Sequence, residues 1–135
     1  MNRSRDTVLL PLMLLYGAAS LLHFFHNAVY LHDYPNLPAW LTAGGVWAAW
    51  LVETGTGVAG YWIYSRLSRV GGWVLIAVYA AFGLAALDHY TVAPVAAHSV
   101  AMNLTILLEA ATAVVLLVYV GRCALWSAPR ASLRG

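Results

Sequence analysis

The sequence predicts an all-α integral membrane protein, a bundle of four transmembrane helices with both termini in the cytoplasm. Of its 135 residues, 62% are hydrophobic and only 9% are charged, and the mean hydropathy is +0.74. Soluble domains contain about 25% charged residues. Because a helix needs about 20 apolar residues to cross a bilayer, the length suits four crossings in a single transmembrane domain, 1–135, with no soluble domain beside it.

Turn and breaker residues divide the chain into these crossings. The predicted spans are about 8–31, 40–64, 73–88 and 95–120, followed by a polar C-terminal tail at 121–135. The first span ends at 32–38, which contains two prolines and an asparagine. The second ends at a short basic loop before Gly71 and Gly72, and the third ends near Asp88, with Pro94 opening the fourth.

The positions of arginine predict the orientation. All seven basic residues are arginines: Arg3, Arg5, Arg66, Arg69, Arg122, Arg130 and Arg134. In a four-span topology they all fall on one side, and positive residues stay on the cytoplasmic side during insertion. We therefore expect a bacterial-type inner membrane protein with cytoplasmic termini. The alternative, a signal peptide ending near 18–20, is disfavoured because the apolar run continues well beyond it.

Composition also excludes several functions. Seven arginines spread over three segments form no basic stripe that could follow a nucleic-acid backbone. The single cysteine, Cys123, cannot form an internal disulfide or a thiolate zinc site. Aromatic residues near the ends of the spans, Tyr34 among them, fit the interfacial belts of membrane proteins.

Ionisable side chains inside the predicted spans are the strongest functional signal, because each costs a few kcal/mol in a bilayer and usually faces the bundle interior. At 100° per residue, one face of the first helix carries Tyr16, Ser20, His23, His26, Asn27 and Tyr30. A face of the second helix carries Glu53, and one face of the fourth carries His98, Met102, Thr105, Glu109 and Thr112. Glu53 and Glu109 lie near the midplane, and the histidines lie toward the outside. These side chains predict a funnel that opens outward and ends at two carboxyls.

Imidazole and carboxylate groups are ligands suited to transition metals. The pattern predicts a metal, iron or copper ahead of zinc, bound by His23, His26 and His98, with Asp88 or His89 completing the shell. Such a site would serve a metal-dependent membrane oxidoreductase or a metal-handling protein.

Three alternatives stay open at this point, as does the question of whether the chain is an enzyme. Glu53 and Glu109 suit a catalytic acid/base pair acting on a lipophilic small molecule, although each also suits a protonated packing role. His26 and His98 suit the axial ligands of a b-type haem. The polar stripes also suit a non-enzymatic accessory subunit that recognises helices of a membrane complex or of a second copy of the chain.

Overall fold

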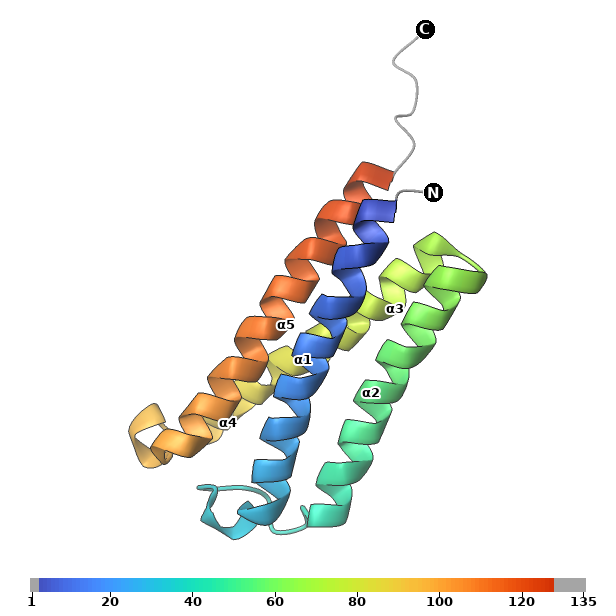
Figure 1. Cartoon of the computed structure of the whole chain (residues 1–135). Coiled ribbons are helices and arrows are strands. Elements are labelled where there is room, and N and C mark those ends of the chain that lie inside the picture. Colours follow the sequence, from blue (N-terminus) through green and yellow to red (C-terminus); the bar gives the residue numbers. More distant parts are fainter. Residues whose placement is uncertain (1–2, 128–135) are drawn as a thin grey trace, which may run out of the picture.

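The computed structural model describes residues 3–127, which form helices joined by short connections and contain no strand. The helical segments are α1 (Arg3–Val29), α2 (Ala43–Arg66), α3 (Arg69–Phe82), α4 (His89–Val92) and α5 (Val100–Ser127), with 3-10 turns η1 (Leu31–Asp33), η2 (Gly83–Asp88) and η3 (Val95–Ala97) (Figure 1). The all-helical fold class is therefore as predicted.

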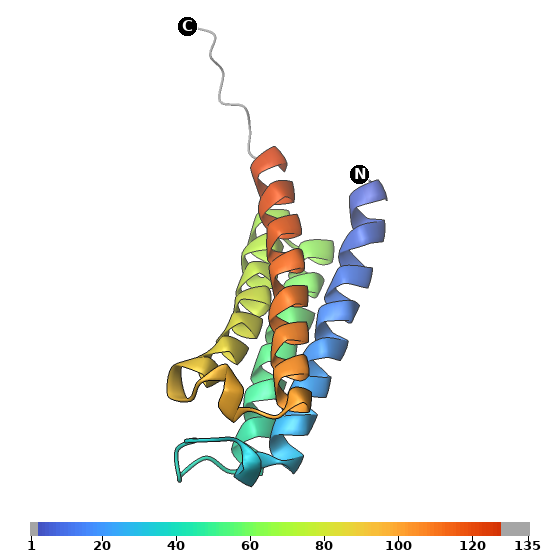
Figure 2. The ribbon, with the colours of Figure 1, turned by 90° about the vertical axis from the view of Figure 1, so that its left-hand side faces the viewer.

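The long helices run up and down beside one another. α2 packs against α3, α1 packs against α5 and α2, and α3 packs against α5. The start of α1, the end of α5 and the turn between α2 and α3 lie at one end of the bundle, while the α1–α2 connection and η3 lie at the opposite end (Figures 1 and 2). Arg66 and Arg69 flank the α2–α3 turn, and Arg122 lies in the last turns of α5. These three arginines thus share one end of the fold.

Three segments are long and apolar enough to cross a membrane: Thr7–Val29, Arg69–Val92 and Val100–Leu125. The segment Arg69–Val92 includes α3, η2 and α4. Together they have the length needed for a crossing, which α3 alone lacks. α2 has 24 residues but is not among these segments, because it contains Glu53 and five glycines. The chain is thus a membrane protein by its apolar helices, and the fourth crossing stays a prediction.

Two helices begin where a side chain caps them. α2 starts at Ala43, later than the predicted 40, because the Thr42 hydroxyl accepts a hydrogen bond from the Gly45 N–H over 3.1 Å. α3 starts at Arg69, earlier than the predicted 73, because the Ser68 hydroxyl accepts from the Gly71 N–H over 3.1 Å.

The last helix is displaced along the chain relative to the predicted span. His98 is extended, with φ −93° and ψ 144°, so α5 begins only at Val100. α5 then continues to Ser127, and the first part of the predicted polar tail is helical because residues 123–126 are good helix formers or apolar. The rest of that tail, with Arg130 and Arg134, lies outside the described residues.

Candidate functional site

Glu53 is held by two hydroxyl groups of α1. The Tyr16 hydroxyl donates to Glu53 Oε1 over 2.7 Å, and the Ser20 hydroxyl donates to the same oxygen over 2.6 Å. All three side chains are buried. Tyr16 and Ser20 are four residues apart and lie on one face of α1, which is why both reach one carboxyl on α2.

Glu109 is fully buried on α5 and has a different environment. Neither of its oxygens has a hydrogen-bond partner among the described residues. The Ser20 hydroxyl gives its one proton to Glu53 and makes no hydrogen bond to Glu109. The His23 Nε2 atom lies 3.7 Å from Glu109 Oε2. Glu109 is thus a buried carboxyl beside an imidazole.

The protonation of the His23 ring follows from its other neighbour. The Thr105 hydroxyl donates to the Met102 carbonyl oxygen over 3.0 Å, so it accepts from His23 Nδ1–H, 3.3 Å away. In a neutral ring, Nε2 then has no proton and is an acceptor, 3.7 Å from Glu109 Oε2. His23 thus presents an unprotonated nitrogen near this carboxyl, beyond hydrogen-bond distance.

Two further histidines extend this arrangement toward the end of the bundle that contains the α1–α2 connection and η3. The ring centroids of His23 and His89 are 5.4 Å apart, and those of His89 and His98 are 6.1 Å apart. His98 Nδ1–H donates to the Pro94 carbonyl oxygen over 3.1 Å, which leaves Nε2 of this buried ring with no partner among the described residues. His89 Nε2 lies 3.3 Å from the Asn27 amide nitrogen. We call His98, His89, His23, Glu109, Ser20 and Glu53 the polar row.

Tyr34 covers the histidine end of the polar row. Its ring is 4.9 Å from His89 and 6.5 Å from His98, and only 4% of the residue is exposed. Burial raises the pKa of Tyr34 to about 12, so the phenol is neutral at physiological pH. The sequence predicted an interfacial belt position for Tyr34 because this residue lies near the end of a span. Nothing in the order of residues shows that the loop folds back over the histidines.

Two predicted metal ligands lie outside the row. His26 is half-buried, and its Nδ1 is 2.9 Å from the Tyr34 hydroxyl. Asp88 is exposed at the end of η2. In the described part of the chain, no group of three or more His, Cys, Asp or Glu side chains is arranged to hold a metal ion. His89 contacts both His23 and His98, so the three rings follow one another in a row.

The described part of the chain is thus a small helical protein with three segments long and apolar enough to cross a membrane, and its interior holds histidine and carboxyl side chains. The buried positions of His23, His98 and Glu109 differ from the lipid-facing stripes expected of an accessory subunit. The chain matches no protein-family model, no curated protein and no solved structure.

Proposed function

We propose that this protein performs acid–base chemistry on a lipid-soluble substrate, with Glu53 and Glu109 as the acid/base pair and the histidines as their proton supply. The observation that carries the proposal is the run of histidines from the end of the bundle with η3 to Glu109, with Glu53 also buried in the interior. Beyond Glu53 the buried core is chiefly apolar, with Leu9, Ile76 and Leu116 at its centre. A row that ends inside the bundle suits delivery of protons to a buried site better than passage through the membrane.

The environments of the two carboxyls support different roles. Glu53 Oε1 already accepts two hydrogen bonds, which fixes the orientation of this carboxyl. Glu109 has no such anchor, and its Oε2 lies 3.7 Å from His23 Nε2. Within the proposal, Glu109 exchanges protons with His23, and Glu53 holds its proton in place for the substrate. Positioned groups of this kind accelerate proton transfer by about 10²–10⁴-fold.

Replacing His23 by phenylalanine is expected to slow proton exchange at the two carboxyls by about tenfold or more, because an aromatic ring without nitrogen interrupts the row. The measurement is hydrogen–deuterium exchange of the carboxylic C=O stretch by infrared spectroscopy on protein in nanodiscs. Glu53→Gln and Glu109→Gln assign the band. His32→Phe is the matched control, since His32 is exposed and outside the row.

His89→Phe, one step further out, provides a second interruption if the His23 variant does not fold. Equal exchange rates in the wild type, a folded row variant and the His32 control would contradict the proposal. The circular dichroism spectrum and melting temperature of each variant establish whether it is folded.

A transition metal is the second candidate, favoured by one observation. His98 Nε2, His89 Nδ1 and both Glu109 oxygens are buried in this region without partners among the described residues, and nitrogen and carboxylate donors suit iron or copper. As they stand these side chains are not grouped around one point, so they would have to move together to hold the ion, which would supply Lewis-acid or redox chemistry. Elemental analysis of the same samples separates the candidates: about one equivalent of metal that disappears in His98→Phe favours the metal site, whereas sub-stoichiometric metal with intact exchange favours acid–base chemistry.

We also propose that α2 is the fourth span of an inner-membrane protein with cytoplasmic termini. The support is the shared end of Arg66, Arg69 and Arg122 in the bundle. Single cysteines at Asn36 and Leu67, both exposed, are expected to react from opposite sides: position 36 in intact spheroplasts and position 67 only after permeabilisation. The native Cys123 is buried and serves as the background. The reverse accessibility would overturn the orientation.

A further inference from the structure

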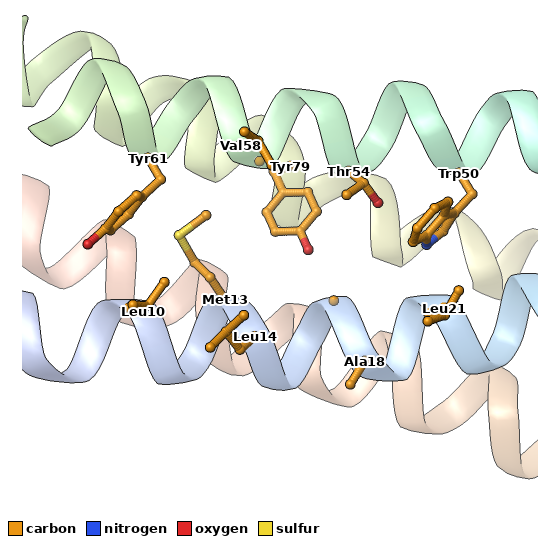
Figure 3. Close-up of a pocket in the computed structure, with 12 residues that line it drawn as sticks. Leu10, Met13, Leu14, Ala18, Leu21, Trp50, Thr54, Val58, Tyr61 and Tyr79 are labelled. Atoms are coloured by element: carbon orange, nitrogen blue, oxygen red, sulfur yellow. The ribbon is translucent and has the colours of Figure 1, made fainter. Parts of the chain in front are cut away.

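A cleft lies between α1 and α2. Its volume is about 460 Å³, within the range of about 300–1,000 Å³ that is usual for small-molecule sites. Its walls are mostly apolar: Leu10, Met13, Leu14, Ala18 and Leu21 on α1, with Val58 and Tyr61 on α2. Figure 3 shows these side chains along the two helices.

The floor of the cleft is Tyr79 of α3, which reaches the space between α1 and α2 at two glycines. A Cβ atom at Gly17 would lie 3.0 Å from the Tyr79 hydroxyl, and one at Gly57 would lie 2.8 Å from the Tyr79 ring. The Tyr79 ring packs on Tyr16, with centroids 4.6 Å apart, and Tyr16 donates to Glu53. The cleft therefore adjoins the carboxyl end of the polar row through two tyrosines.

Two polar atoms in the cleft wall lack partners. Trp50 Nε1 and Thr54 Oγ1 are both buried, and neither has a hydrogen-bond partner among the described residues. In Figure 3 the indole nitrogen of Trp50 is on the side that faces α1, and the Tyr79 hydroxyl points toward the same space. An indole N–H can only donate, so its partner must be an acceptor. An unpaired buried donor costs about 1–3 kcal/mol, which a ligand with an acceptor group would recover.

We infer that this cleft binds one membrane-soluble molecule that has a carbonyl headgroup and an apolar body, held by Trp50 and Thr54. The inference rests on the proposed function only for the next step, in which the bound molecule is the substrate of Glu53. Trp50 and Thr54 lie on either side of Glu53 in the sequence of α2. Other atoms cover both donors in the structure, so the Trp50 and Thr54 side chains turn toward the cleft to donate to the carbonyl oxygen, and the apolar body fills the space along α1.

Bulk lipid and a second helix fit the cleft less well. If α2 spans the bilayer, Thr54 lies near the midplane and Trp50 about 5–7 Å from it, whereas ester carbonyls of phospholipids lie at the edge of a hydrocarbon core about 30 Å thick. An acyl chain at this depth brings no acceptor. The backbone carbonyls of a neighbouring helix are already bonded within that helix.

Photolabelling with a decyl-substituted benzophenone tests the inference, because its ketone is both the acceptor and the photoreactive group. Labelled peptides from protein in nanodiscs are expected to come from α1 and α2. Thr54→Val is expected to weaken labelling by about threefold to tenfold, the value of one hydrogen bond. Thr56→Val is the matched control, because the Thr56 hydroxyl donates to the Val52 carbonyl oxygen and does not line the cleft.

Two further comparisons make the result decisive. Ala18→Phe fills the cleft and is expected to abolish labelling, whereas Ala49→Phe, at an exposed position of α2 outside the cleft, is expected to leave it unchanged. Decyl-substituted diphenylmethane, which lacks the carbonyl, is expected to compete poorly.

Equal competition by diphenylmethane, or equal labelling of the Thr54 and Thr56 variants, would overturn the inference and indicate a cleft filled by acyl chains. Glu53→Gln and Glu109→Gln are expected to keep labelling. Labelling tests binding in the cleft, and carboxyl exchange tests the acid–base proposal. A failure of one measurement is therefore distinguishable from a failure of the other.

Discussion

Replacing Gly72 by alanine is expected to lower the free energy of unfolding by about 3 kcal/mol, near the upper end of the usual cost of overpacking. A Cβ atom at Gly72 would lie 2.3 Å from Tyr64 Cα and 2.5 Å from Tyr64 N. These are backbone atoms of α2, so no change of rotamer relieves the overlap. α3 must move away from α2, and the contacts of Ile76 and Tyr79 with α2 loosen with it.

Thermal unfolding in detergent, followed by circular dichroism, measures this effect. Gly55→Ala is the matched control on α2, because a Cβ atom there meets no other atom within 4 Å. Since alanine forms helix better than glycine, the control is expected to keep the melting temperature or raise it. A Gly72 variant as stable as the Gly55 control would contradict the close contact between Gly72 of α3 and the Tyr64 backbone of α2.

The two carboxyls are expected to respond in opposite ways to replacement by leucine. Glu53→Leu leaves the buried hydroxyls of Tyr16 and Ser20 without their acceptor, and is expected to cost about 2–4 kcal/mol of stability. Glu109→Leu removes a buried carboxyl that has no hydrogen bond among the described residues, and is expected to leave stability unchanged or increase it. Under the acid–base proposal, Glu109→Leu also abolishes carboxyl exchange through His23.

Melting temperatures of both variants, beside Glu53→Gln and Glu109→Gln, measure this difference. Glu53→Gln keeps an oxygen acceptor for Tyr16 and Ser20, so it is expected to recover most of the stability lost in the leucine variant. A large loss of stability in Glu109→Leu would make Glu109 a packing element. A Glu53→Leu variant as stable as the wild type would contradict the hydrogen bonds drawn for this carboxyl.

Helical periodicity was informative about what each helix presents to the interior. Tyr16, Ser20 and His23 share a face of α1, and the structure places all three in the buried interior. The same reasoning failed at His98, which was expected to lie one turn before Met102 on a helix. Its backbone is extended, and the ring instead reaches the interior because Nδ1 is anchored on the Pro94 carbonyl oxygen.

By itself, the sequence determined that the chain is helical, that it belongs in a membrane and which polar groups must avoid lipid. The physical reason is that these properties depend on composition and on the 3.6-residue period, which are local. Only the tertiary structure decided that the histidines follow one another in a row, that Tyr34 folds over them, and that Tyr79 forms the floor of a cleft between α1 and α2. Those features depend on which helices are neighbours and on their relative depth, and both are determined by close approaches at Gly17 and Gly57 to Tyr79, between residues far apart in the chain.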